Sequence, residues 1–297
     1  MKIRVVLLAA LTAASLTAAD PLAERIGHSD PARYQARQGV HAGAGEMSFG
    51  SLLPGNAIHN LGFLHRGVIA PKGGIGHHFH NSTEEMFLIY NGEAQFTIDG
   101  RTAVVKGPVG VPVRLGSSHA IYNHTDQPLE WMNISVRVSD MPQLPRGADP
   151  SRSFDLGDDR VGATLDRVPA FMTAKLYRDL LRPVEQLHGG QGTVQYRRTV
   201  GPSLFRTNWA YVDHLVLPAG ATVGRHLHEG LEEFYYVIKG EGNIKVNGEM
   251  AAVRTGDAIP ILAKEAHALD NTSGQDLEVI VVGVALEKGV LDTTDVP

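Results

Sequence analysis

The sequence predicts an all-β protein built from two tandem copies of one strand-rich barrel, and three observations support this. First, when the chain is aligned with itself so that His78 falls on His226, the two halves match without a gap from about Gly76 to Glu130. Second, short β-rich runs are separated by Asp-Gly and Asn-Gly turns. Third, 33 of the 297 residues are glycine and 16 are proline, a composition typical of many strands joined by turns.

The repeat concentrates on residue types that form turns or carry chemistry, whereas chance matches would scatter over all types. Identical residues of the two copies include several glycines, histidines, a proline, a glutamate and an asparagine. Among them are His78, His80, Glu85, Gly92, Gly100, Pro112, His119 and Asn123, which fall on His226, His228, Glu233, Gly240, Gly248, Pro260, His267 and Asn271.

Each copy contains two runs that favour strands. They cover residues 85–90 and 94–98 in the first copy and 233–238 and 243–246 in the second. The pairs Asp99-Gly100 and Asn247-Gly248 follow them and indicate tight hairpins, since both residue types tolerate a positive φ. The spacers are too short to hold the helix that a parallel sheet needs, so the sheets are expected to be antiparallel.

The regions outside the copies are less regular. Residues 141–150 are rich in proline and indicate a linker, and residues 170–181 carry apolar side chains at helical spacing before Pro183. We therefore expect a short helix there, with Met172, Leu176 and Leu180 on its core face. The predicted organisation is a signal peptide (1–19), an N-terminal arm (20–55), a first barrel (56–140), a linker with a short helix (141–195), a second barrel (196–288) and a tail (289–297).

The first nineteen residues resemble an export signal. Lys2 and Arg4 precede an apolar run, and small residues up to Ala19 suit cleavage before Asp20. The run is too short to span roughly 30 Å of hydrocarbon, so we expect a secreted or periplasmic protein that has no membrane segment in its mature form.

Charge and composition exclude several function classes. The formal net charge is −5 and the pI about 6.3, which disfavours nucleic acid as a partner. The absence of cysteine excludes disulfides, thiolate-bound zinc, iron–sulfur clusters and a thiol nucleophile. Histidine, with 14 residues, is the abundant metal-ligating side chain that remains.

The second copy carries a metal-ligating pattern. His226 and His228 are two residues apart, so on a strand both imidazoles project from one face. Glu233 starts the following strand and can return beside them, and His267 lies in a later turn-rich segment. Three neutral imidazoles and one carboxylate suit a divalent transition metal. The first copy repeats this set with His78, His80, Glu85 and His119.

Several neighbouring residues leave alternatives open. Glu84 and Glu232 also repeat, but the spacing to the following glycine favours Glu85 and Glu233 as ligands. Asn123 and Asn271 are interpreted as turn formers rather than substrate contacts. Of the adjacent residues Tyr235 and Tyr236, one is expected in the core and the other at the barrel mouth. Four polar residues that precede the metal motifs are either substrate contacts or ordinary sheet polarity: His65, Arg66, Asp213 and His214.

These motifs resemble the cupin superfamily and, with two copies, the bicupins. The first cupin motif, G-x5-H-x-H followed by Glu and then Gly, is matched by Gly220, His226, His228, Glu233 and Gly240; in the first copy the leading glycine, Gly73, stands one residue closer. The second motif is represented by Pro260, His267 and Asn271 and by Pro112, His119 and Asn123, with a longer interval between Pro and His than the family pattern. The resemblance covers about residues 60–137 and 205–286.

The resemblance implies two double-stranded β-helix (jelly-roll-like) barrels, each with a quartet that binds a divalent transition metal. Mn or Fe is the first expectation, with Ni, Cu or Zn as alternatives and up to two ions per chain. It further implies an exported metal-dependent enzyme, an oxidoreductase or lyase of dioxygenase or decarboxylase type, acting on a small carboxylic acid, enol or sugar derivative.

Other readings stay open. A non-catalytic metal- or ligand-binding bicupin and a cupin isomerase or lyase of sugar derivatives are the alternatives. Assembly into a homo-oligomer is also an open alternative. The second copy follows the motif more closely and is expected to be the working site. No general acid or base can be named from the sequence. For a decarboxylase, a lid carrying a glutamate would be sought at about residues 147–169.

Overall fold

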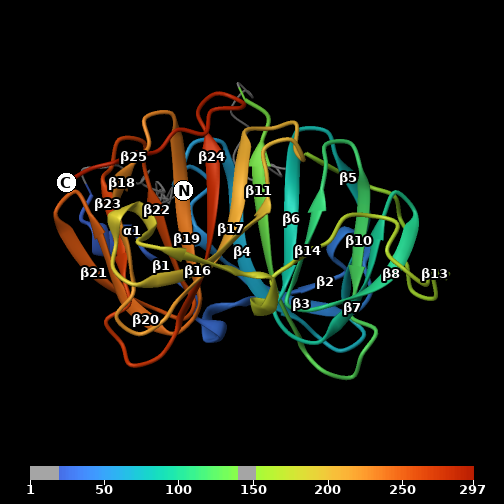
Figure 1. Ribbon diagram of the computed structural model, residues 1–297. Helices are drawn as coiled ribbons and strands as arrows, with labels where there is room; N and C mark the ends of the chain where they lie inside the picture. The colour runs from blue at the N-terminus through green and yellow to red at the C-terminus, as the bar shows by residue number, and fades with distance from the viewer. Residues whose placement is uncertain (1–19, 140–151) are drawn as a thin grey trace, which may run out of the picture.

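The computed structural model describes residues 20–139 and 152–297, and in it two barrels stand side by side (Figure 1). The all-β prediction is confirmed, because the described chain folds into four sheets that are antiparallel apart from one short parallel pair. The predicted signal peptide and the whole Pro-rich stretch 141–150 lie outside the described residues. No helix among the described residues combines the length and apolar character needed to cross a membrane.

Barrel one consists of a seven-stranded and a six-stranded sheet. The seven-stranded sheet has the order β14 (Ala174–Lys175), β9 (Val109–Val113), β6 (Thr83–Ile89), β11 (Leu129–Arg137), β4 (Leu61–Ile69), β3 (Glu46–Leu53) and β2 (Gln35–Gln38). The six-stranded sheet has the order β12 (Ser153–Asp155), β5 (Gly74–His80), β10 (Ser118–Tyr122), β7 (Glu93–Ile98), β8 (Arg101–Lys106) and β13 (Leu165–Asp166).

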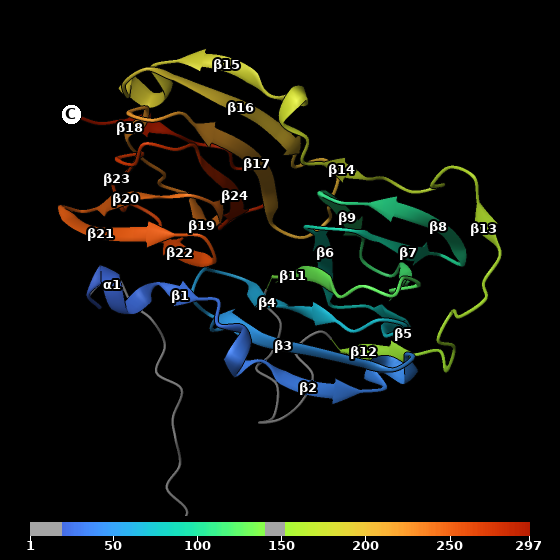
Figure 2. The ribbon, with the colours of Figure 1, turned by 90° about the horizontal axis from the view of Figure 1, so that it is seen from below.

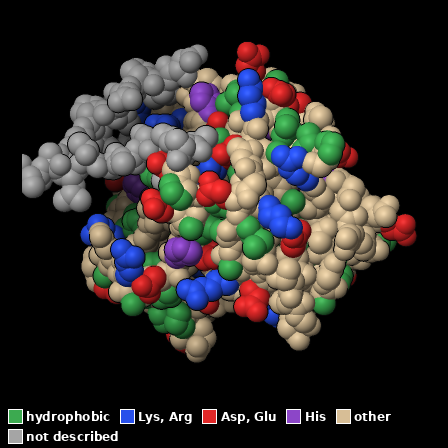
Figure 3. All heavy atoms as spheres, turned by 90° about the vertical axis from the view of Figure 1, so that its left-hand side faces the viewer, with side chains coloured by type: hydrophobic (Ala, Val, Ile, Leu, Met, Phe, Trp, Pro, Cys, Tyr) green, Lys and Arg blue, Asp and Glu red, His purple; other side chains and the backbone are tan. Residues whose placement is uncertain are grey.

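Barrel two has the corresponding construction. Its seven-stranded sheet has the order β1 (Gly27–His28), β22 (Asp257–Ile261), β19 (Leu231–Lys239), β24 (Leu277–Ala285), β17 (Trp209–Leu217), β16 (Thr193–Val200) and β15 (Arg182–Glu185). Its five-stranded sheet has the order β21 (Glu249–Arg254), β20 (Glu241–Val246), β23 (His267–Asp270), β18 (Thr222–Leu227) and β25 (Thr294–Asp295). Figure 3 views this end of the molecule, where acidic and basic side chains are interspersed.

The hairpins form where the sequence predicts them. Asp99 and Gly100 join β7 to β8 with φ values of 49° and 77°, and Asn247 and Gly248 join β20 to β21 with 48° and 93°. Two successive positive φ values match the twist of the flanking strands, which explains the choice of Asp-Gly and Asn-Gly.

The two seven-stranded sheets pack against each other at the centre of the molecule. One apolar cluster includes Leu64, Met132 and Ile134 from barrel one together with Phe234 and Ile280 from barrel two, all with an exposed fraction of 0%. Each barrel has a second apolar cluster between its own two sheets. Central strands such as β17 and β24 are therefore buried on both faces, which is why they are almost continuously apolar rather than alternating.

Two repeated glutamates join the barrels. Glu84, fully buried on β6, accepts hydrogen bonds from the backbone N–H groups of Arg206 and Thr207 at 2.7 and 2.6 Å and from the Thr207 hydroxyl at 2.8 Å, all in barrel two. Its repeat mate Glu232 accepts a bond from the backbone N–H of His59 in barrel one. The interpretation that Glu84 and Glu232 are not the metal ligands agrees with this placement, which gives them an inter-barrel role.

The N-terminal segment serves both barrels. A short helix, α1 (Leu22–Arg25), ends at Arg25, whose Nη2 forms an ion pair with the Glu265 carboxylate at 2.6 Å; both side chains are 3% exposed. Strand β1 then pairs with β22 of barrel two, and β2 and β3 continue into barrel one. The second repeat does the reverse: β14 pairs with β9 of barrel one before β15 and β16 enter barrel two (Figure 2). Each repeat therefore gives its first strand to the other barrel.

The helix expected over residues 170–181 does not form as such. This stretch contains strand β14 and a single 3-10 turn, Arg178–Leu180. Ala174 and Leu176 are buried while Lys175 between them is exposed, which is the alternation of a strand. Met172, expected in the core, has an exposed fraction of 45%. Pairing with β9 outweighs the helical spacing of the apolar residues.

Candidate metal centre

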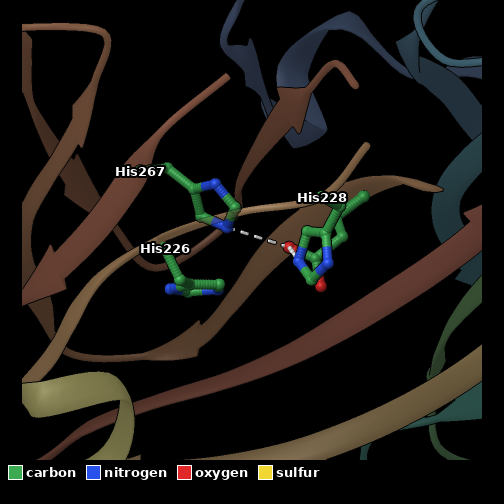
Figure 4. A group of neighbouring side chains, drawn as sticks. His226, His228 and His267 are labelled. Carbon is green, nitrogen blue, oxygen red and sulfur yellow. Dashed lines mark hydrogen bonds and ion pairs between the residues drawn. The ribbon is translucent and has the colours of Figure 1, made fainter. Parts of the chain in front are cut away.

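The predicted quartet of barrel two comes together inside the barrel. His226 lies on β18 opposite His267 on β23, His228 follows the end of β18, and Glu233 lies on β19 of the facing sheet. The three imidazoles converge, and a dashed line marks the 3.1 Å contact from His267 Nε2 to the Glu233 carboxylate (Figure 4). One ligand atom from each of the four residues lies within 4.8 Å of all the others, and all four residues are buried.

Backbone carbonyls fix the orientation of the three imidazoles. The Nδ1 atoms of His226, His228 and His267 are bonded to the carbonyls of Gly224, Asp292 and Glu265. An Nδ1–H that donates to a carbonyl leaves Nε2 with a lone pair, which is the tautomer a metal ligand needs. Among the described residues, the buried Nε2 of His228 makes no hydrogen bond and lies 3.5 Å from the Glu233 carboxylate, an arrangement that a cation bound between the two groups would satisfy.

Electrostatics favour the metal-binding protonation state of two of the ligands, His226 and Glu233. Burial, reinforced by the neighbouring His267, lowers the pKa of His226 to about 3. Burial alone raises the pKa of Glu233, but the neighbouring imidazoles of His228 and His267 outweigh that effect and hold the pKa well below its usual range. The donor set at neutral pH therefore includes a neutral His226 and an ionised Glu233, which suits a divalent ion.

Barrel one repeats the arrangement with looser anchoring. His78, on β5, faces His119 on β10, and His80 ends β5. Ligand atoms of these three histidines lie within 4.8 Å of one another, and Glu85 on β6 contacts His80 and His119 at 3.3 and 3.6 Å. The ring of His78 donates to the Gly76 carbonyl at 2.7 Å, whereas the buried Nδ1 of His119 has no hydrogen-bond partner in the described part of the chain.

The two carboxylates are held by different partners. In barrel two the Tyr211 hydroxyl donates to Glu233, and burial together with Glu233 keeps the pKa of Tyr211 well above its usual value, so it stays a phenol. In barrel one the Asn133 amide donates to Glu85 at 2.9 Å. The repeat thus preserves the ligands while varying the groups that support them.

Each centre opens into a cavity, and the cavities differ in character. That of barrel two measures about 280 Å³ and includes polar and charged side chains beside the ligands: Tyr196, Arg198, Tyr211 and Asp213. That of barrel one measures about 190 Å³ and is lined mainly by aromatic side chains, among them Phe49, Phe63, Phe87 and Trp131. A polar substrate is therefore accommodated better in barrel two.

Both barrels match a known protein family. The cupin domain family model matches the chain twice, over residues 65–135 and 213–283. The oxalate-binding protein of Thermotoga maritima is 31% identical over 103 residues, which are 35% of this chain and 85% of that protein. The chain belongs to the cupin superfamily. With two cupin domains it is a bicupin, as the resemblance implied.

Other relatives and solved structures extend the comparison. The tetracenomycin polyketide synthase protein TcmJ of Streptomyces glaucescens is 26% identical over 105 residues, 34% of this bicupin and 70% of that protein. An oxalate decarboxylase mutant of Bacillus subtilis matches with a TM-score of 0.61 and 15% identity over 91% of this chain and 79% of that one. The oxalate decarboxylase–formate complex of Lactobacillus farciminis gives 0.60 and 16%, covering 91% and 88%. These solved structures share the fold with this bicupin.

The repeated asparagines form turns, as expected. The Asn123 amide donates to the Gln127 carbonyl and its oxygen accepts from Thr125, and Asn271 makes the same bonds with Gln275 and Ser273. Each asparagine also donates to a carbonyl of the strand that precedes the metal motif. These side chains close the barrel loops of the bicupin.

The polar residues before the metal motifs divide between the two faces of their strands. His65 and Asp213 line the cavities. Arg66 instead bonds to Tyr236 across the barrel interface, and His214 bonds to Glu278 at 2.8 Å. The neighbouring tyrosines also divide: Tyr235 lines the barrel-two cavity, and Tyr236 packs into the inter-barrel core.

The lid expectation needs correction. Residues 147–169 contain no glutamate. Within the described part of this stretch, β12 pairs with β5 and β13 pairs with β8, so it lies along the six-stranded sheet of barrel one.

Sequence reasoning missed four residues of the bicupin centres. Arg198 and Tyr211 line the barrel-two cavity but have no identical repeat mate, so the internal comparison did not select them. His41 and His188 stack on ligand histidines. His41 and His188 are separated by one residue fewer than His78 and His226, so an ungapped alignment of the two copies does not place them opposite each other.

Proposed function

We propose that this bicupin is a metal-dependent enzyme that acts on a small carboxylic acid at the barrel-two centre, with oxalate as the first candidate substrate. The supporting observation is a guanidinium group, Arg198, that lines the same cavity as His226, His228 and Glu233. A bound divalent ion would supply Lewis acidity toward a substrate oxygen at this quartet. The names of the oxalate-binding relative and of the oxalate decarboxylase structures direct the choice of substrate.

Arg198 is built to recognise a carboxylate. Its Nε and Nη2 atoms bond to Asp213 at 2.9 Å each, which fixes the plane of the guanidinium. The guanidinium also lies over the Tyr211 ring at 4.2 Å from its centre. With Nε–H and one Nη2–H engaged, the two N–H groups of Nη1 and the second N–H of Nη2 can donate to a substrate carboxylate, and charge-assisted bonds of this kind are short and strong.

The surrounding residues prepare the site for such a substrate. Asp213 is held by Arg198 and by the Tyr196 hydroxyl at 3.0 Å, so its charge is satisfied before substrate arrives. Tyr211 orients Glu233. A cavity of about 280 Å³ suits a molecule of a few heavy atoms rather than a large one.

Replacing Arg198 by Gln is expected to raise KM for oxalate by about 10- to 100-fold, since one charge-assisted hydrogen bond is worth about 1.5–3 kcal/mol. The assay follows oxalate consumption and oxygen uptake by the Mn(II)-loaded full chain. Arg197→Gln, at the next position on the same strand and therefore on the opposite face, is the matched control and should leave KM unchanged. An unchanged KM in Arg198→Gln would contradict the substrate assignment.

A second candidate is binding without turnover. The relative that supports it is the oxalate-binding protein, of which the match covers 85%. Calorimetric oxalate binding to the Mn(II)-loaded protein, with no product and no oxygen uptake, would favour this candidate over the enzyme.

We also propose that the chain is exported. The basic residues Lys2 and Arg4, the apolar run and the small residues up to Ala19 support it. The expected result is a protein recovered outside the cytoplasm whose N-terminal residue, determined by mass spectrometry, is Asp20. An intact Met1 on the cytoplasmic protein would contradict the proposal.

A further inference from the structure

Two histidines outside the quartets lie flat against metal-ligand histidines. The ring of His41 stacks on that of His78 with centroids 3.9 Å apart and an interplanar angle of 13°. In barrel two, His188 stacks on His226 at 4.0 Å and 18°. Both stacking rings also line the cavity of their barrel. The same contact therefore occurs at the first ligand of each quartet.

Each stacking histidine is anchored by an aspartate. His41 Nδ1 is 2.6 Å from Asp155, and His188 Nδ1 is 2.7 Å from Asp295. The anchoring residue stands directly opposite the ligand in the strand register, since Asp155 pairs with His78 and Asp295 pairs with His226. These aspartates come from different places in the chain: β12 follows barrel one, and β25 lies near the C-terminus.

The backbone brings these turns unusually close to the ligand strands. His41 and His188 have φ values of 52° and 54°, a left-handed conformation that is costly for a residue with a side chain. A Cβ on Gly76 would lie 2.0 Å from the His41 carbonyl oxygen, and one on Gly224 would lie 1.9 Å from that of His188. Only glycine fits at these two strand positions, and both strands have it.

We propose that His41 and His188 are positioning residues that fix the ring planes of His78 and His226 for metal binding. The inference rests on the proposed function, in which the quartets hold a metal. The Nδ1 bonds to the Gly76 and Gly224 carbonyls hold each ligand ring at its edge, and the stacked imidazole holds its face. A ring supported in both directions keeps Nε2 aimed into the centre.

A role for His41 and His188 in packing alone would not explain their left-handed backbone and their aspartate partners. An aliphatic side chain would cover a ligand ring without a left-handed backbone and without an aspartate from a distant segment. In both barrels the ligand strand, the histidine-bearing turn and the aspartate-bearing strand converge in the same way. Other positions around the cavities differ between the copies: Phe63 corresponds to Tyr211, and Gly50 corresponds to Arg198. What the two copies retain is the support of the first ligand.

The test measures metal binding to the full chain, independently of turnover. In a His80→Ala background, which removes a ligand from barrel one, Co(II) is titrated in competition with a chelator while the visible spectrum is recorded. His188→Ala is expected to weaken Co(II) binding by about 10-fold and to change the ligand-field bands. His188→Phe, which keeps a flat ring, and Asp295→Asn, which weakens the anchor, should give smaller changes in the same direction. His59→Ala in the same background, at an exposed histidine that lines neither cavity, is the matched control and should change neither quantity.

The outcomes separate the inference from the proposed function. Suppose that the His80→Ala protein takes up Co(II). If His188→Ala and Asp295→Asn in that background are folded by circular dichroism and keep its affinity and spectrum, the positioning role is overturned while the metal centre stands. If His188→Ala does not fold, Asp295→Asn decides, and an unchanged spectrum overturns the inference. If neither the wild type nor the His80→Ala protein takes up Co(II), the proposed function fails and the inference fails with it.

Discussion

His226→Ala is expected to abolish activity and to remove the metal of barrel two, whereas His78→Ala should leave most of the activity in place. The reason is the difference between the centres: the three imidazoles of barrel two are each fixed through Nδ1 by a backbone carbonyl, and Arg198 lines the same cavity. Losing one of four ligands from a preorganised set leaves too few donors to retain the ion. Barrel one has an aromatic cavity and a less anchored His119.

Metal analysis of the purified proteins accompanies the activity assay. Each variant should lose about one ion per chain relative to wild type, and only His226→Ala should lose turnover. His59→Ala, an exposed histidine away from both centres, controls for loss of an imidazole as such. Equal loss of activity in both ligand variants, or full activity of metal-free protein, would contradict the assignment of barrel two as the working site.

Glu84→Ala is expected to lower the free energy of unfolding by about 4 kcal/mol. The substitution removes the acceptor for Arg206 N–H, Thr207 N–H and the Thr207 hydroxyl, as well as for Leu115 N–H at 3.0 Å. Buried donors left without a partner cost about 1–3 kcal/mol each, and relaxation recovers part of that sum. Urea unfolding followed by fluorescence measures the change.

Two further variants make this prediction specific. Glu232→Ala should cost less, because Glu232 is only partly buried and accepts bonds from the backbone of His59 and, at 3.5 Å, of Ala263. Glu185→Ala, on the exposed edge strand β15, should change stability by less than about 0.5 kcal/mol. A loss below about 1 kcal/mol in Glu84→Ala would contradict the assignment of a stabilising inter-barrel role to the Glu84 hydrogen bonds.

The ligand quartets were predictable because strand geometry is local. A spacing of two residues places His226 and His228 on one face whatever the rest of the chain does, and the repeat gave the same result for His78 and His80. The hairpins were predictable for the same reason, since Asn-Gly and Asp-Gly encode their own backbone angles.

The remainder depends on partners far away in the sequence. Asp155 and Asp295 are separated in the sequence from the histidines that they bind by 114 and 107 residues, and no local sequence pattern predicts such contacts. The segment at 170–181 was misread because its apolar residues fit both periods, and the choice was made by pairing with β9. Arg198, the proposed substrate contact, was missed because the corresponding residue of the first copy is Gly50, so the internal repeat does not mark it.

The reciprocal exchange of first strands bears on how the protein is made. Strand β1 pairs with residues at Asp257 and Ala258, so during synthesis it has no partner until most of the chain has left the ribosome. Barrel one, which is synthesised first, lacks its edge strand β14 until the second repeat has begun. Neither barrel can finish its seven-stranded sheet from its own repeat, and pairings of such long range fold slowly. Both barrels, each of which carries one metal centre, therefore complete their sheets only when strands from both repeats are available.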